Sequence, residues 1–176
     1  MEEKIALPVK DNTKYFQKLF FIEDVKEWDV NDTNLYELKV TLEEEGENGA
    51  QKGIDFTQSE CVTIGFRDIT LDPDHGFFLN GRHTKLNGVC IHHDLGALGS
   101  AYNSTAMRRR MLQLKEMGVN AIRLTHNMYD PDVLRLADEL GFILISEAFD
   151  MWEGAKTEFD YARFFPKWHA KDVASW

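Results

Sequence analysis

Three stretches of the sequence decide the fold: NGVCIHHD (residues 87–94), VNAIRLTHN (residues 119–127) and GFILISEAFDMW (residues 141–152). In each stretch a short apolar run ends in charged, polar or ring-bearing residues. Segments with helical periodicity separate the three runs. Strands that alternate with helices and end in chemically capable side chains are typical of a (β/α) barrel, which builds its site at the C-terminal ends of its strands.

The apolar runs predict three parallel strands, at Asn87–His92, Ala121–Leu124 and Phe142–Ile145. The third run is apolar throughout, as expected of a parallel strand that is covered on both faces. A further helix is expected to begin within Phe159–Trp176. A complete barrel of this type has eight strands. The sequence therefore predicts the first three β/α units of a (β/α)8 TIM barrel.

The two helices between the strands carry start and stop signals. The first is expected over Thr105–Met117, and the second begins at the Asp-Pro pair of residues 130–131. Capping residues precede the helices and glycines follow them; in chain order they are Asn103 or Ser104, Gly118, Asp130 and Gly141. The predicted buried faces are Met107, Met111, Leu114 and Met117, then Val133, Leu136, Ala137 and Leu140.

Residues 1–76 are predicted to be all-β. Apolar and polar residues alternate, or apolar residues gather, in four strand candidates: Lys4–Val9, Phe16–Ile22, Leu35–Leu42 and Val62–Thr70. This spacing favours an immunoglobulin-like β-sandwich, which has about seven strands. Four or five strands are visible, so we expect a partial sandwich that lacks its beginning.

A turn-forming cluster, DPDHG at residues 72–76, marks the predicted domain boundary. The sandwich would occupy residues 1–76, and the barrel portion would occupy residues 77–176. The Asn80-Gly81 pair predicts a hairpin between Phe77–Leu79 and Thr84–Leu86, because Asn-Gly favours the tightest hairpin turns. This hairpin would lead into the first barrel strand.

The 176 residues carry a net charge of −10. A negative chain argues against nucleic-acid binding and against binding to anionic membranes, since both need a basic surface. It suits a neutral ligand such as a sugar. No apolar run is long enough to span a membrane, and no signal peptide is visible, so the compartment is left open. Cys61 and Cys90 match no zinc motif and are expected to be buried free thiols.

Candidate site residues follow each predicted parallel strand. His92 and His93 are adjacent on an extended chain and therefore point to opposite sides, which disfavours a shared metal ion. A neutral imidazole can donate to and accept from a sugar hydroxyl, although structural histidines at a strand end fit the same pattern. Arg123 lies inside an apolar strand and needs a carboxylate partner, either at a site or in a structural ion pair.

His126 follows the second strand, and Glu147, Asp150 and Trp152 follow the third. The ring face of Trp152 suits stacking against a sugar, although a core tryptophan is the alternative. No cofactor is indicated.

Several segments resemble glycoside hydrolase family 2, the group that contains β-galactosidases, β-glucuronidases and β-mannosidases. In chain order they are WDVNDTNLY (residues 28–36), GFR (65–67), FLNG (78–81), GVCIHHD (88–94), NAIRLTH (120–126) and EAFDMW (147–152). Three positions depart from the family pattern: Thr33 replaces a proline, Leu124 a small residue and Ser146 an aspartate. Six matches in the family's order make the resemblance specific.

The resemblance implies a retaining glycosidase that acts on terminal, non-reducing β-galactosides. It places His92 and His126 in the sugar subsite and Arg123 beside the catalytic carboxylates, with Glu147, Asp150 and Trp152 lining or supporting the same pocket. The family's acid/base and nucleophile glutamates have no match in the chain, so no catalytic residue is assigned and the chain alone is expected to be inactive. We expect association, either as a homo-oligomer or with the rest of the enzyme.

Two other functions fit parts of the sequence. A non-catalytic module would bind carbohydrate, or complement another chain, without cleaving a bond. A metal-dependent barrel hydrolase would use His92 as a ligand and would lose activity with a chelator.

Overall fold

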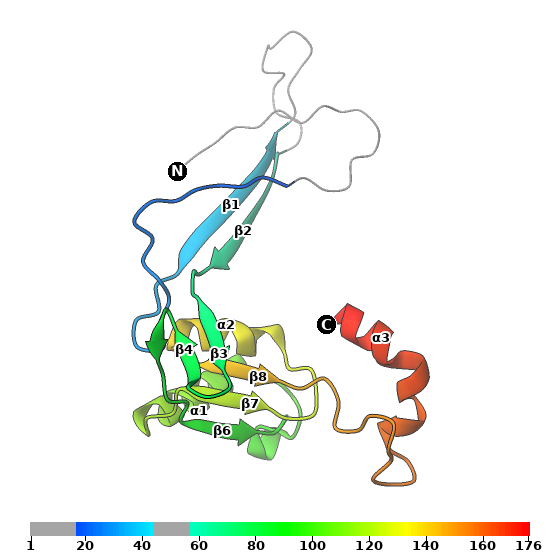
Figure 1. Ribbon diagram of the computed structural model, residues 1–176. Helices are drawn as coiled ribbons and strands as arrows, with labels where there is room; N and C mark the ends of the chain where they lie inside the picture. Colours follow the sequence, from blue (N-terminus) through cyan, green and yellow to red (C-terminus); the bar gives the residue numbers. More distant parts are fainter. Residues whose placement is uncertain (1–16, 44–56) are drawn as a thin grey trace.

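The computed structural model describes residues 17–43 and 57–176 (Figure 1). An antiparallel ribbon contains β1 (Tyr36–Glu43) and β2 (Thr57–Ile64). A small antiparallel sheet contains β3 (Ile69–Asp72), β4 (Gly76–Leu79) and β5 (Arg82–His83). A parallel sheet contains β6 (Gly88–Ile91), β7 (Ala121–Leu124) and β8 (Ile143–Ser146), in that order.

Helices connect the strands of the parallel sheet. α1 (Ser104–Glu116) joins β6 to β7, and α2 (Pro131–Leu140) joins β7 to β8. Short 3-10 turns lie at Gly96–Leu98 and Tyr161–Arg163, and α3 (Phe165–Ser175) follows the second of these. α3 lies beyond the end of β8, away from the parallel sheet (Figure 1). Among the described residues, no helix is long and apolar enough to cross a membrane.

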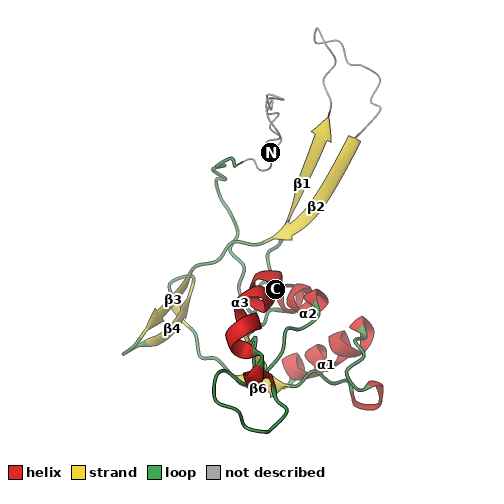
Figure 2. Ribbon diagram, turned by 90° about the vertical axis from the view of Figure 1, so that its right-hand side faces the viewer, coloured by secondary structure: helices red, strands yellow, loops and turns green. Residues whose placement is uncertain are grey.

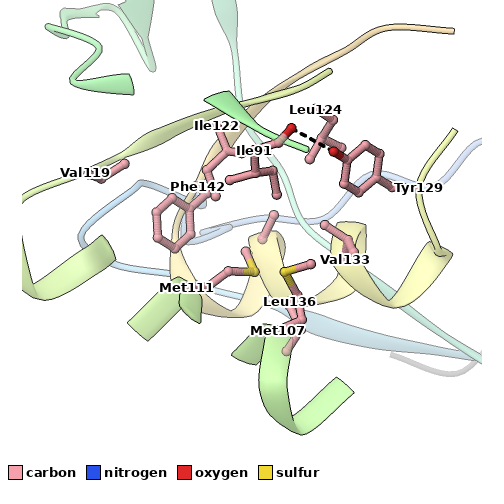
Figure 3. Close-up of a cluster of buried hydrophobic side chains, with 11 residues drawn as sticks. Ile91, Met107, Met111, Val119, Ile122, Leu124, Tyr129, Val133, Leu136 and Phe142 are labelled. Carbon is pink, nitrogen blue, oxygen red and sulfur yellow. Dashed lines mark hydrogen bonds between the residues drawn. The ribbon is translucent and has the colours of Figure 1, made fainter. Parts of the chain in front are cut away.

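The main core lies between the parallel sheet and the two connecting helices (Figure 3). Ile91, Ile122 and Leu124 face Met107 and Met111 of α1 and the buried stripe of α2, which is Val133, Leu136 and Ala137. Successive side chains along a strand point to opposite faces of the sheet. Cys90 and Arg123, each next to a residue of this core, therefore lie on the face away from the helices. Packing both helices on one face leaves that opposite face for other contacts.

The predicted local signals position these helices. The side chain of Asn103 accepts a hydrogen bond from the N–H of Ala106 at 2.9 Å, which confirms it as the N-cap of α1. Asp130 caps α2 by accepting from the N–H of Asp132 at 2.9 Å. Gly141 ends α2 in the left-handed conformation with φ of 78°, where a side chain is unfavourable.

A second core joins the N-terminal part of the described chain to the base of the parallel sheet. Trp28, Val30 and Leu79 pack against Ala121 and Ile143. Polar contacts reinforce this junction. The indole N–H of Trp28 donates to the carbonyl of Asp138 at 2.7 Å, and the Lys115 ammonium donates to the carbonyls of Val30 and Gly141 at 2.6 and 2.7 Å.

The β-rich part differs from the sequence expectation in three places. Residues 17–22 lie in no strand, and Val62–Thr70 is interrupted between β2 and β3. The interruption arises because the main chain there bonds elsewhere: the carbonyl of Phe66 accepts from the N–H of Trp28 at 2.7 Å, and the N–H of Asp68 donates to the side chain of Asn80 at 2.9 Å. The Asn80-Gly81 hairpin is confirmed, but its second strand is Arg82–His83 and not Thr84–Leu86. Lys4–Val9 lies outside the described residues.

The ribbon of β1 and β2 projects away from the parallel sheet in both views (Figures 1 and 2). Cys61 is exposed on this ribbon, and Cys90 is exposed on the sheet face opposite the helices, so the expectation of two buried thiols was wrong. Ile145 is 52% exposed because helices cover only one face of β8. Met117 is 75% exposed because α1 ends at Glu116, before it.

Candidate active site

The C-terminal ends of β6, β7 and β8 bring five of the six predicted site residues together. They are His92, Arg123, His126, Glu147 and Asp150. The parallel registers place Cys90 opposite Arg123, and Arg123 opposite Ile145, so the strands end side by side. The strand ends therefore form one cluster of polar side chains, as expected for parallel strands.

Glu147 is the carboxylate partner that Arg123 requires. The Nε–H of Arg123 donates to Oε1 of Glu147, and the main-chain N–H of His126 donates to Oε2 at 3.0 Å. These two bonds, the one from His126 first, hold the pKa of Glu147 below its ordinary value. Nη1 of Arg123 also lies 3.4 Å from the Cys90 sulfur, and the bonds to Cys90 and Glu147 raise the arginine pKa.

His126 occupies an unusual backbone conformation, with φ of 72°. Its Nδ1 lies 3.2 Å from Oδ1 of Asp150 and 3.5 Å from Oε2 of Glu147. Its ring meets the ring of His92 edge-on, with the centroids 5.4 Å apart. A non-glycine residue in the left-handed region is uncommon and is often found at functional sites.

Asp150 is paired with Lys156, whose ammonium lies 2.9 Å from Oδ1. The hydrogen bond from Lys156 is the main cause of the lowered pKa of Asp150. Lys156 therefore belongs to the cluster, although no signal in the sequence linked it to Asp150. Cys90 was missed as well, because its place beside Arg123 depends on the register of β6 and β7, which no local pattern in the sequence gives.

His93 points away from this cluster, as the alternation of side chains on an extended chain predicts. Its ring stacks on Tyr129, with the centroids 5.0 Å apart. The Tyr129 hydroxyl donates to the carbonyl of Ile91 at 2.7 Å, and the hydroxyl of Thr125 donates to the same carbonyl at 2.7 Å (Figure 3 draws the bond from Tyr129). These buried bonds fix the end of β6 next to the end of β7.

Trp152 stands apart from the other five residues. It is 70% exposed, so it is not a core tryptophan, and its ring lies parallel to Phe165 at a centroid separation of 6.5 Å. Phe165 in turn stacks on His169 with the centroids 4.7 Å apart. Trp152 thus belongs to an aromatic cluster beside α3, two residues beyond Asp150.

The cluster offers hydrogen-bonding groups and no evident metal cage. In residues 17–43 and 57–176, no three His, Cys, Asp or Glu side chains are arranged to hold a metal ion. The imidazoles of His92 and His126 can each donate to or accept from a hydroxyl group. Both carboxylates are already engaged by cations, so the arrangement suits the binding of a neutral polar molecule.

The parallel strands, their connecting helices and the polar cluster at the strand ends are arranged as in part of a TIM barrel. The family model "Glycosyl hydrolases family 2, TIM barrel domain" matches residues 72–170. The chain therefore belongs to glycosyl hydrolase family 2, as the sequence motifs predicted.

Relatives of the chain are named for two different activities. The chain is 44% identical over 163 residues to the beta-galactosidase BoGH2A of Bacteroides ovatus, and this match covers 90% of this chain and 18% of that protein. The chain is also 35% identical over 156 residues to a protein named putative beta-glucuronidase from Formosa agariphila, and this match covers 88% of this chain and 14% of that protein. The chain thus spans less than a fifth of the length of these relatives.

Solved structures agree with the family. A family 2 glycosyl hydrolase from Bacteroides cellulosilyticus matches with a TM-score of 0.73 and 36% identity, over 85% of this chain and 18% of that chain. A beta-glycosidase from Bacteroides vulgatus matches with a TM-score of 0.72 and 33% identity, over 84% of this chain and 18% of that chain. Each likeness covers less than a fifth of the solved chain.

Proposed function

We propose that the protein containing this chain is a retaining glycosidase that hydrolyses terminal, non-reducing β-D-galactosides. One observation carries the choice of a neutral sugar: the cations of the cluster are already paired, Arg123 with Glu147 and Lys156 with Asp150. A uronic acid would bring its own carboxylate, which needs a cation as partner. The 44% identity to a protein named beta-galactosidase supports the same choice.

In this proposal the described residues bind the sugar and do not break the bond. His92 and His126 bond to hydroxyl groups, Arg123 faces the reacting centre, and Trp152 offers an exposed ring face two residues beyond Asp150. A retaining glycosidase uses one glutamic acid as acid/base and a second as the covalent nucleophile. No residue of the chain is matched to either role, so residues 1–176 alone are expected to hydrolyse nothing.

The finer fold assignment is part of the same proposal. Residues 1–76 would form the immunoglobulin-like sandwich and residues 77–176 the first three units of the barrel. Apolar side chains on one face of the ribbon support a second sheet there, since Leu38, Val40 and Val62 are exposed. The exposed Ile145 on β8 similarly supports association, with the rest of the enzyme or with a second copy.

A non-catalytic carbohydrate-binding module is the second candidate. It is favoured by the engagement of both carboxylates in ion pairs, which leaves hydrogen-bonding groups but no free acid in the described cluster. Such a module would bind galactose in calorimetry, whereas the full-length protein would release no product from any glycoside.

The direct test compares hydrolysis of nitrophenyl β-D-galactopyranoside, β-D-glucuronide and β-D-mannoside by the full-length protein. We expect the galactoside to give the highest kcat/KM. A preference for the glucuronide would refute the argument from paired cations. The 176-residue chain serves as the matched control, and measurable turnover by it would show that a catalytic pair lies within these residues.

A further inference from the structure

The carboxylate of Glu147 connects two points at the end of β7. Oε1 accepts the Nε–H of Arg123, and Oε2 accepts the main-chain N–H of His126 at 3.0 Å. The N–H of Glu147 itself donates to the carbonyl of Leu124 at 3.2 Å. One residue just beyond β8 is therefore bonded to three residues at the end of the neighbouring strand.

The conformation of His126 explains why such a support is needed. Its φ of 72° lies in the left-handed region, which non-glycine residues occupy only when the surroundings hold them there. Two bonds support this conformation: the His126 N–H donates to the Glu147 carboxylate, and the N–H of Asn127 donates to the carbonyl of Thr125 at 2.9 Å across His126. As a result the imidazole meets His92 edge-on and reaches Asp150 at 3.2 Å.

The same bonds determine the charge state of Glu147. The N–H of His126 and the guanidinium of Arg123 hold its pKa below the ordinary value, which further favours the anion that a glutamate already is at neutral pH. An anion with both oxygens engaged is a stable anchor for two neighbours. It is poorly suited to donating a proton, and it has less capacity left for hydrogen bonds from a ligand.

We propose that Glu147 is a positioning residue, which acts through Arg123 and His126 and does not itself contact the sugar. Of the two roles that the family resemblance implied for Glu147, lining the pocket or supporting it, this is the supporting one. Its consequence for hydrolysis rests on the proposed glycosidase function. The two bonds that Glu147 accepts from Arg123 and His126, called the clamp below, can be measured without any activity.

The clamp is tested by NMR on the 15N-labelled 176-residue chain. We expect a downfield, exchange-protected Nε–H resonance, assigned to Arg123 by its loss in Arg123→Lys. In Glu147→Gln this resonance should shift upfield and exchange faster, and Glu147→Asp, which keeps the charge on a shorter side chain, should restore it only in part. In Glu153→Gln, a nearby exposed control, it should stay unchanged. An unaltered resonance in Glu147→Gln would overturn the clamp.

The positioning role is tested by kinetics on the full-length protein with the nitrophenyl galactoside. By analogy with partners that orient metal-binding side chains, Glu147→Gln should lower kcat/KM by roughly 10- to 100-fold, and Glu153→Gln should leave it unchanged. Because Glu147 acts in part through Arg123, the Arg123→Lys/Glu147→Gln double variant should lose less than the product of the two single losses.

Two other outcomes are distinct. Losses that multiply in the double variant would mean that Glu147 does not act through Arg123, which contradicts the positioning role proposed for it. A wild-type protein that hydrolyses no glycoside would refute the proposed function, while the NMR measurement would still decide whether Glu147 holds Arg123.

Discussion

The carbonyl oxygen of Val30 fills the space that a side chain on residue 141 would need. A Cβ atom added to Gly141 would lie 2.2 Å from that oxygen, and φ at this glycine is 78°. The end of α2 is therefore packed directly against the segment that leads into the ribbon. This contact, together with Lys115 and Trp28, joins the N-terminal part of the described chain to the base of the parallel sheet.

Replacing Gly141 with alanine should separate the two packed segments. We expect Gly141→Ala to lower the free energy of unfolding by about 2–4 kcal/mol, from the left-handed backbone and the clash with Val30 together. Gly118→Ala is the matched control, since Gly118 also has a positive φ of 82° but no atom within 4 Å of an added Cβ. It should cost about 1–2 kcal/mol. Equal losses in urea denaturation would mean that Val30 does not pack on Gly141 in solution.

The core between helices and sheet can be tested with two methionines near each other in the sequence. Met111 is fully buried against the parallel sheet, whereas Met117 is largely exposed. Met111→Ala should cost about 2–5 kcal/mol of unfolding free energy through lost burial and a cavity. Met117→Ala should change it by less than about 0.5 kcal/mol. A large effect at Met117 would support the helix face expected from the sequence, which included both methionines.

Acid should weaken the start of α2 through Asp132. Hydrogen bonds from Ser104 and Tyr102, and the guanidinium of Arg135, lower the pKa of Asp132 from 3.8 to about 2. Because the folded-state pKa is the lower one, the stabilisation is complete above pH 3.8 and is lost as pH falls towards 2. Asp132→Asn should therefore flatten the fall in unfolding free energy between about pH 4 and 2.

Asp138→Asn provides the control of opposite sign. Burial raises the pKa of Asp138, so this carboxylate destabilises the fold as pH rises through its titration range. Its removal should leave the acid-induced loss in place. The measurement is acid unfolding monitored by circular dichroism. If Asp132→Asn loses as much unfolding free energy as the wild type between about pH 4 and 2, the partners of Asp132 do not lower its pKa in the folded state.

Local signals explain which parts of the fold the sequence could predict. Asn103, Asp130 and Gly141 act on residues within one helical turn, and they defined α1 and α2 almost to the residue. Val62–Thr70 was misjudged because its interruption depends on Trp28 and Asn80, whose positions in space no local pattern reveals. Met117 satisfied the helical period, but the helix ended one residue before it.

In the candidate site, too, the sequence predicted some features and missed those that depend on distant residues. The cost of an unpaired charge in an apolar strand predicted that Arg123 has a carboxylate partner, and the structure identifies that partner as Glu147. The choice between Glu147 and Asp150 depends on how β7 and β8 align, which the sequence does not encode locally. The left-handed backbone of His126 likewise had no sequence signal, since histidine gives no preference strong enough to predict it.

We propose that residues 1–176 help to hold a galactoside while glutamates outside these residues perform the reaction. Trapping the full-length protein with a 2-deoxy-2-fluoro-β-galactosyl fluoride, followed by peptide mass spectrometry, tests this claim most directly, because retaining enzymes form a covalent glycosyl intermediate. We predict one fluorogalactosyl adduct, on a glutamate that is not among residues 1–176. An adduct on Glu147, or on any other residue of this chain, would contradict the account.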